Sequence, residues 1–448
     1  MPDRLVPDPW EPSVDVSLTD EQTAIAGRFS ALFRADLLPA LRRLYEHPAA
    51  PGPSGAPDPE DATAGRAVWR ALVELGATRL LLPTELGGEG AGQRGAVVLA
   101  ELAGTALYGG PLLDTMTATE ALLPGAFAAA DGTAKYLAEI ADGAAVPLAP
   151  RARGHDDPAD PAPLPAVGTP GIRLHRRLVA AAPEGRYLLV LGRAGAAAGG
   201  GVHGALVRSD DPTLTCRQHE DVTRGGLYAV ELADTPVLAW VHPADPVGVT
   251  GVTGAGRARG GARTGDAASA AGAAGGLGAA GPFRNADPRS GWPGLVARAR
   301  LRHAGYLVGL VQGALDLAVA RVKERRQFGR ELGRFQALAF RLAELTARTE
   351  GVRWLVRSAA WEADTGRDPR LTAAQSLAAA ADLAGDATAA AMQLHGAYGL
   401  TDAADIQICY RRAHLDRVWQ GSAAALRREV FPLLVAERKF AHRTDPAG

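Results

Sequence analysis

The stretch LVGLVQGALDLAVARVKERRQFGRELGRFQALAFRLAEL (residues 307–345) carries the pattern that is most informative about the fold. Its apolar residues recur every three or four positions from Leu307 to Val322, and again from Phe335 to Leu345. This spacing is that of amphipathic helices. The basic segment RRQFG (residues 325–329) separates the two runs. The pattern therefore predicts two consecutive helices joined by a short, positively charged turn.

Helical spacing continues on both sides of this stretch. Towards the C-terminus it predicts helices over about 371–394 and 422–440, which complete a four-helix bundle over residues 295–442. Near the N-terminus, Thr19 is followed three residues later by Gln22, the signature of a capping box at a helix start. An N-terminal helical domain is predicted over residues 17–146, with helices at about 20–47, 61–75, 91–107, 111–123 and 132–141.

The sequence between these helical parts has a different character. Short apolar runs separated by Gly, Pro and Asp predict a small central β-barrel or β-sandwich domain over residues 147–249. The runs are YLLVL (187–191), GALV (204–207), LYAVEL (227–232) and VLAWV (237–241). Residues 250–294 are a low-complexity insert rich in Gly, Ala and Arg, and residues 1–16 are a Pro-rich leader. Helices, then strands, then helices indicate an α+β protein built of separate domains.

The composition restricts the classes of function. The chain has 448 residues, with 48 Lys and Arg against 49 Asp and Glu, so its formal net charge is -1. This balance argues against a basic nucleic-acid footprint and a polybasic membrane anchor. Cys216 and Cys409 are the only cysteines, too few for a disulfide framework or a Cys-rich metal site. With no recognisable secretory signal or uncharged apolar span, we expect a cytoplasmic protein without nucleic-acid, membrane or metal partners.

Four segments, in order along the chain, carry a resemblance to a known family. They are VWRALVELGATRLLLPTELGGEG (68–90), RRQFG (325–329) with Gln336 eight residues after its Phe, QLHGAYG (393–399) and YRRAHLDRVWQGS (410–422). In this order, on either side of a predicted β domain, they resemble the acyl-CoA dehydrogenase family over nearly the whole chain outside the leader and the insert. The resemblance implies that family's α+β fold, an FAD cofactor and a homo-oligomer or hetero-oligomer.

The resemblance also implies which residues bind FAD. Arg325 would contact the pyrophosphate of FAD in a neighbouring subunit, which suits the guanidinium fork, and Gln336 would bind on the adenylate side. Gly396 permits a close approach of the backbone to the dinucleotide, although Ala397 replaces the usual second Gly. We interpret His395 as a helix-end histidine with a structural hydrogen bond rather than as a catalytic group. The full set implied for cofactor binding is Arg325, Phe328, Gln336, Gln393, Leu394, His395, Gly396, Ala397, Ser422 and Ala423.

The catalytic position departs from the family. There a Glu removes the α-proton of an acyl thioester while the flavin accepts a hydride, and the residue aligned with it here is Gln420. An amide has no useful basicity, although the backbone N–H of residue 420 remains to hold the thioester oxygen. Some members place the Glu on an earlier helix, where this chain has Ala299. Gly421 and Arg411 are the implied substrate-binding residues, and for Arg411 we prefer a structural ion pair. The nearby carboxylates, interpreted as surface charges, are Asp402, Asp405 and Asp416.

The flavin-contacting segment of the family is altered as well. Its counterpart is LAPRARGHDD (148–157), where Ala149 stands at a Thr position and His155 at a Ser position. The Trp-bearing strand that follows in the family is not recognisable within residues 172–187. FAD binding is therefore expected to depend on the RRQFG and QLHGA segments.

Three hypotheses remain open from the sequence. The first is an acyl-CoA dehydrogenase-like flavoprotein acting on an acyl thioester of CoA or a carrier protein, with electron-transfer flavoprotein or oxygen as acceptor. The second is a flavin-dependent monooxygenase on the same fold, which needs no α-base. The third is a non-catalytic or half-site subunit that pairs with an intact homologue and supplies Arg325, Gln336 and Gln393 across the interface.

Overall fold

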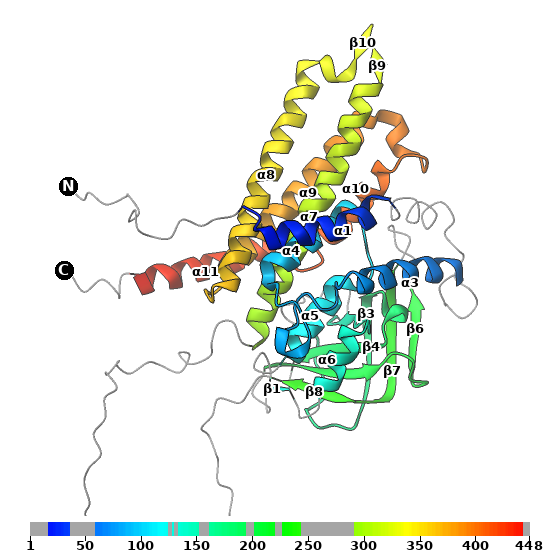
Figure 1. Ribbon diagram of the computed structural model, residues 1–448, viewed down its shortest axis with the longest axis vertical. Helices are drawn as coiled ribbons and strands as arrows, with labels where there is room; N and C mark the ends of the chain where they lie inside the picture. Colours follow the sequence, from blue (N-terminus) through cyan, green and yellow to red (C-terminus); the bar gives the residue numbers. More distant parts are fainter. Residues whose placement is uncertain are drawn as a thin grey trace, which may run out of the picture.

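The computed structural model describes residues 17–35, 59–123, 128–129, 133–151, 161–193, 201–219, 226–242 and 291–441. The predicted leader lies outside the described residues. So does the predicted insert, apart from residues 291–294, which form the start of a helix. Figure 1 shows a lower body that holds the sheets and a helical arm that projects from it.

The N-terminal helices are α1 (Asp20–Ala35), α3 (Pro59–Glu74), α4 (Gly92–Thr105), α5 (Leu112–Leu122) and α6 (Ala134–Ala141), with a 3-10 turn η1 (Thr84–Leu86) before α4. The capping box at the start of α1 is confirmed. The Gln22 N–H donates to Thr19 Oγ1 (3.3 Å), and the Thr19 N–H donates to Gln22 Oε1 (3.2 Å). These bonds satisfy two backbone donors that a helix start leaves unpaired. Residues 36–47 of the predicted first helix lie outside the described residues.

The central strands form a two-layer sandwich. They are β1 (Ala128–Ala129), β2 (Leu148–Ala149), β3 (Gly171–Ala180), β4 (Tyr187–Arg193), β5 (Val202–Arg208), β6 (Leu214–Gln218), β7 (Leu227–Pro236) and β8 (Ala239–His242), with the 3-10 turn η2 (Ala182–Glu184). A five-stranded sheet has the order β1-β8-β5-β4-β2, and a three-stranded antiparallel sheet has the order β3-β7-β6. Val190 and Val230 belong to the core between the sheets, whereas Leu189 packs with Ile140 on the side of α6. This alternation is the two-residue period of a strand buried on both faces.

The C-terminal helices are α7 (Gly291–Glu324), α8 (Gln336–Asp364), α9 (Arg370–His395), α10 (Ile406–Asp416) and α11 (Ala423–Ala441), with the 3-10 turns η4 (Leu332–Arg334) and η5 (Gly396–Leu400). The RRQFG segment is the turn between α7 and α8, where β9 (Arg326–Gln327) pairs with β10 (Arg330–Glu331). This hairpin is the tip of the arm in Figure 1. The sequence pattern did not predict α10, because its charged residues obscure the apolar spacing.

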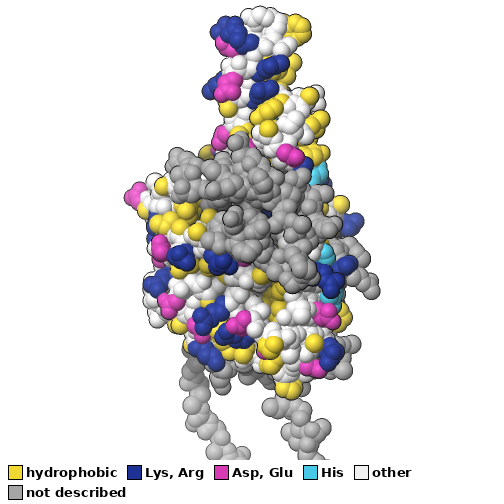
Figure 2. All heavy atoms as spheres, turned by 90° about the vertical axis from the view of Figure 1, so that its right-hand side faces the viewer, with side chains coloured by type: hydrophobic (Ala, Val, Ile, Leu, Met, Phe, Trp, Pro, Cys, Tyr) yellow, Lys and Arg dark blue, Asp and Glu magenta, His cyan; other side chains and the backbone are white. Residues whose placement is uncertain are grey.

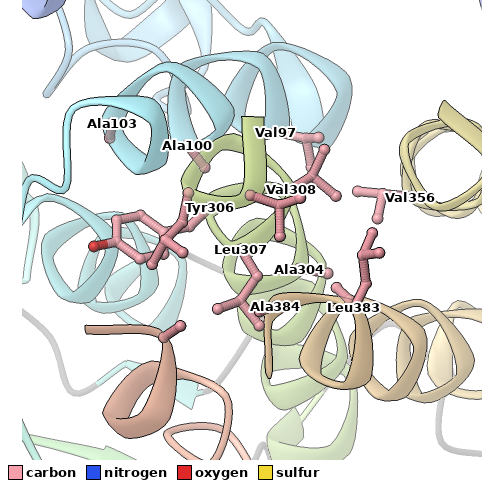
Figure 3. Packing of buried hydrophobic residues seen from close by; sticks show 14 of the residues in the cluster. Val97, Ala100, Ala103, Ala304, Tyr306, Leu307, Val308, Val356, Leu383 and Ala384 are labelled. Carbon is pink, nitrogen blue, oxygen red and sulfur yellow. The ribbon is translucent and has the colours of Figure 1, made fainter. Parts of the chain in front are cut away.

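Helix α7 packs between α4 and α9, in the core that joins the N- and C-terminal helices (Figure 3). Val97 of α4, Leu307 of α7 and Ala384 of α9 are buried there together. By length and composition α7 could cross a membrane, but 61% of its most apolar window is buried inside the fold. That burial is the pattern of a core helix.

Two glycines allow α4 and α7 to approach closely. A Cβ atom on Gly104 would lie 1.8 Å from the carbonyl oxygen of Tyr306, and one on Gly309 would lie 1.8 Å from that of Glu101. Both distances are far below van der Waals contact with a backbone atom that cannot swing away. The crossing of the two helices therefore requires Gly on each side.

A buried ionic cluster joins α5 to α7. Arg302, with no exposed surface, donates to Glu120 (2.6 Å), Gln93 (2.9 Å) and Thr117 (2.9 Å). Arg298 forms a second ion pair with Glu120 at 2.7 Å. Burial tends to raise the pKa of Glu120, but the two arginines outweigh it and hold that pKa below its usual value. The cluster fixes α5 against α7 beside the candidate site.

Candidate active-site region

Two small cavities, of about 20 and 60 Å³, lie where α5 and α7 meet the segment between α10 and α11. The residues that line both cavities are Asp114, Thr117, Ala299, Trp419 and Gln420. Gln420 and Ala299 are the two positions at which the resemblance places a catalytic Glu. Although they are far apart in the sequence, the structure brings them to one place.

The backbone at Gln420 is held by Arg300 of α7. Arg300 Nε donates to the Gln420 carbonyl oxygen (3.2 Å), and the same guanidinium forms a 2.6 Å ion pair with Glu429 of α11. Gly421 follows with a φ of 114°, which Gly adopts without strain. Neither Gln420 nor Ala299 has an ionisable side chain. The two usual base positions therefore supply only an amide and a methyl group.

Asp114 brings a carboxylate into both cavities, although no sequence pattern indicates it. It lies in the first turn of α5, and its Oδ2 accepts a hydrogen bond from the Leu148 N–H (3.0 Å). Burial raises the pKa of Asp114 to about 6, against the opposing effects of the Leu148 N–H and the Arg151 charge. An acid in the first turn of a helix is common because it complements the helix dipole. Its position in the sequence therefore gave no signal of a role in a cavity.

The interpretation of Asp416 as a surface charge is wrong. Asp416 is buried at the end of α10, lies 3.1 Å from the Arg412 guanidinium and accepts a 2.6 Å hydrogen bond from the His303 ring at its carbonyl oxygen. It is buried because α10 packs this face against α7. Asp402 is exposed and lies 3.8 Å from Arg411, which does not line either cavity.

Arg151 connects the β part of the molecule to the segment that carries Gln420. The residue is 4% exposed, and its guanidinium lies 4.4 Å from the centroid of the Trp419 ring. It also donates a hydrogen bond to the Trp419 carbonyl oxygen. A guanidinium held over an indole away from water is a strong cation–π contact. No sequence pattern indicates this contact, because Arg151 lies in an Arg-rich segment without periodicity.

The contact between Arg151 and Trp419 decides whether a flavin ring fits here. By the resemblance, both residues 148–157 and the residues after Gln420 would contact the ring. In this structure the Arg151 and Trp419 side chains bridge the two segments directly. The remaining spaces, about 20 and 60 Å³, hold roughly one to a few water molecules. With the side chains as they stand, neither cavity has room for a three-ring isoalloxazine. Ala149 is buried between the sheets, and His155 lies outside the described residues.

Arg325, Phe328 and Gln336 lie at the tip of the arm, apart from the cavities (Figure 1). The Arg325 N–H donates to the Arg321 carbonyl oxygen (2.9 Å) at the end of α7, and Gln336 is the first residue of α8. All three are exposed, Phe328 by 91%. Arg325 has no ion pair within the described part of the chain. The tip therefore exposes two groups to solvent: the Arg325 guanidinium, which has no ion pair among the described residues, and the Phe328 ring.

The QLHGA segment spans the end of α9 and the start of η5. The Arg321 guanidinium lies 5.0 Å from the centroid of the Tyr398 ring, which connects η5 to the last turn of α7. His395 Nδ1 hydrogen-bonds to the Ala391 carbonyl oxygen of its own helix (2.8 Å), and burial lowers its pKa. This bond matches the structural interpretation of His395. The exposed members of the segment are Gln393, Gly396 and Ala397.

The remaining predicted cofactor residues have local structural roles. Ser422 Oγ accepts the Ala425 N–H (3.2 Å) at the start of α11. Leu394 and Ala423 pack against the helical core. None of the three lines the cavities around Gln420.

Comparison with known proteins gives a family match for the C-terminal part of the chain. The family described as "Acyl-CoA dehydrogenase, C-terminal domain" matches residues 294–431. The short-chain specific acyl-CoA dehydrogenase of Clostridium acetobutylicum is 34% identical over 141 residues, which is 32% of this chain and 36% of that relative. The chain thus matches little more than a third of that relative's length.

Solved structures match over the whole fold. Butyryl-CoA dehydrogenase from Megasphaera elsdenii and the ChsE4–ChsE5 complex from Mycobacterium tuberculosis are similar at a TM-score of 0.68 and 19% identity. Each similarity covers 94% of this chain and 99% of the other chain. At this identity it establishes the fold and not the activity, and the α+β fold predicted from the sequence is confirmed.

Proposed function

Since this chain belongs to the acyl-CoA dehydrogenase family, through its C-terminal domain and its fold, we propose that it is a half-site subunit. It pairs with a homologous subunit that keeps the catalytic Glu and binds FAD. The pair acts on an acyl thioester of CoA or of a carrier protein. Electron-transfer flavoprotein or oxygen then reoxidises the reduced FAD of the pair.

The observation that carries this proposal is the contact between Arg151 and Trp419. By a buried cation–π contact and a hydrogen bond, it joins the two segments that, by the resemblance, would contact a flavin ring. Gln420 and Ala299 also leave both usual base positions without a carboxylate. The chain's own pocket therefore has no carboxylate at either usual base position and, with the side chains as they stand, little space beside Gln420.

Three exposed residues support the second part of the proposal, in which this chain contacts the FAD bound by its partner. Arg325, Gln336 and Gln393 are exposed, and Arg325 has no ion pair within the described residues. An unpaired guanidinium on an exposed tip suits the pyrophosphate of a dinucleotide bound by another subunit. When bound in the partner, FAD supplies the hydride acceptor, and the residues of this chain hold and orient its far end. The ChsE4–ChsE5 complex, which joins two differently named proteins, has the same fold.

The two other hypotheses require this chain to hold flavin by itself. A stand-alone dehydrogenase needs a flavin ring beside an ionisable base, and a monooxygenase needs the ring beside its substrate. The closed space between Arg151 and Trp419 speaks against both.

The test compares the chain alone with the chain co-expressed with a homologue from the same genome that keeps the Glu. We expect the chain alone to purify without the yellow colour of oxidised flavin, and the pair to purify with FAD. Arg325→Ala in this chain should weaken FAD retention by the pair roughly tenfold or more, because hydrogen bonds from Arg to pyrophosphate are charge-assisted.

The matched control is Arg334→Ala on the same arm. Arg334 is paired with Glu331 at 3.1 Å, so its loss should leave FAD retention by the pair unchanged. Stoichiometric FAD in the chain alone, bleached anaerobically by an acyl thioester, would show that the chain is a dehydrogenase in its own right.

A further inference from the structure

A groove of about 450 Å³ lies on the outer face of the three-stranded sheet. It shares no lining residue with the cavities around Gln420. Its outward-facing side chains are His175 and Arg177 of β3, Thr215 and Arg217 of β6, and Ala229 and Glu231 of β7. Figure 2 faces the side of the molecule on which β6 lies in Figure 1, and Lys, Arg and His side chains gather at the right-hand edge of its lower body.

The register of the sheet explains why this face is hollow. β7 is the middle strand, and Ala229 on it stands opposite Arg217 of β6. Arg177 lies in the β-bulge between Arg176 and Val179 of β3, and it lines the groove together with Ala229. The Ala229 methyl group on the middle strand therefore lies between the longer side chains of Arg177 and Arg217 on the flanking strands. At the next outward position, Glu231 of β7 stands between His175 and Thr215.

The charges in the groove are unbalanced. Arg177 and Arg217 are exposed, and neither has an ion pair within the part of the chain that the structure describes. By contrast, Arg173 on the same strand pairs with Asp234. The two unpaired guanidinium groups are anchored two strand spacings, or about 10 Å, apart. Glu231 is the only carboxylate that lines the groove among the described residues, so the two arginines leave it with net positive charge.

We propose that this groove binds a small phosphate ester of nucleotide size. Arg177 and Arg217 hold its phosphate groups from both sides, as guanidinium forks do in phosphate sites. Glu231 and Thr215 accept hydrogen bonds from sugar hydroxyl groups, a role that carboxylates have in nucleotide sites. A volume of about 450 Å³ lies in the range of small-molecule sites. The proposal does not depend on the half-site function, because the groove is remote from the arm tip.

The test measures binding of ADP and of inorganic pyrophosphate to the full chain by titration calorimetry at low ionic strength. ADP should bind, and more tightly than pyrophosphate. Arg177→Ala and Arg217→Ala should each weaken ADP binding roughly tenfold or more, because each removes charge-assisted hydrogen bonds. Arg177→Lys should recover part of the loss by keeping the charge. All these side chains are exposed, so the variants should retain the circular dichroism spectrum of the parent.

Two controls separate this groove from other sites. Arg173→Ala removes an exposed arginine of the same strand that is already paired, and Arg334→Ala removes a paired arginine of the arm. Both should leave ADP affinity unchanged within about twofold, the scatter of distant sites. Absence of ADP binding at millimolar concentration would overturn the proposal. So would pyrophosphate binding as tightly as ADP, or a loss of ADP binding in Arg325→Ala but not in Arg177→Ala.

Discussion

At the scale of single residues, the cavity beside Gln420 has no carboxylate at the two usual base positions but contains other buried polar groups. Asp114 lines it with a pKa raised to about 6. The Tyr108 hydroxyl is buried without a hydrogen-bond partner among the described residues, and burial raises its pKa well above the usual value. Buried polar groups without full partners reduce stability. Such groups are typical of sites shaped for a ligand rather than for packing alone.

Asp114→Asn should make the chain more stable at neutral pH. Since the pKa of Asp114 in the folded chain is raised from 3.8 to about 6, the neutral carboxyl stabilises the fold below about pH 4, and this contribution is lost as the pH rises through about 6. An Asn side chain is neutral at every pH and can still accept the Leu148 N–H. The variant should gain up to about 3 kcal/mol in free energy of unfolding at pH 8 and almost nothing at pH 4.

Urea denaturation of parent and variant at several pH values between 4 and 8 measures this difference. Asp402→Asn, at an exposed carboxylate, is the control and should differ from the parent by less than about 0.5 kcal/mol at each pH. A gain that did not change with pH would mean that Asp114 is already neutral, or not buried, in the folded chain.

Gln420→Glu should not turn the isolated chain into a dehydrogenase. The change restores a carboxylate at the usual position, but the Arg151–Trp419 contact still joins the two segments that, by the resemblance, would contact a flavin ring. We expect no bleaching of added FAD by an acyl thioester under anaerobic conditions, measured against the co-expressed pair as the positive control. Appearance of such activity in the isolated variant would contradict the half-site proposal.

At the scale of elements, the repeating apolar spacing in the sequence predicted helices correctly. Single contacts between residues far apart in the chain could not be predicted. The three- and four-residue spacing on either side of residues 325–329 predicted α7 and α8, because a long buried face repeats many times along a helix. The contact of Arg151 with Trp419 joins residues far apart in the chain and leaves no repeating pattern. The burial of Asp416 likewise depends on how α10 packs against α7, which its own sequence does not encode.

Two Gly-to-Ala changes in helices should have opposite effects on stability, because Gly309 lies at the close crossing of α4 and α7 and Gly351 does not. Gly309→Ala should destabilise the chain by about 3 kcal/mol or more, because the new methyl group would meet the Glu101 carbonyl oxygen at 1.8 Å. Gly351→Ala in α8 meets nothing within 4 Å and should stabilise by about 0.5 to 1 kcal/mol through helix propensity. Chemical denaturation of both variants gives the signs, and a neutral Gly309→Ala would show that the helices are farther apart than described.

At the scale of the whole molecule, the half-site proposal predicts the cofactor content of the assembly. The co-expressed pair should contain about one FAD for every two chains, because only the partner holds the ring while this chain completes its far end. Flavin absorbance relative to protein, together with native mass spectrometry, measures this ratio. A ratio near one FAD per chain would mean that the Arg151 and Trp419 side chains separate in the assembled protein.

Helix α7 runs without a break from the cavity beside Gln420 to the exposed tip of the arm. Ala299 faces the cavities near the start of α7, and Arg325 directly follows its last residue. At about 1.5 Å per residue, roughly 39 Å of unbroken helix separates them. Since α7 is buried against α4 and α9 over much of this length, the helix acts as a rigid strut. It holds the cavity and the Arg325 end of the arm at a fixed separation, so the position of the arm tip relative to a partner is set by the fold of this chain alone.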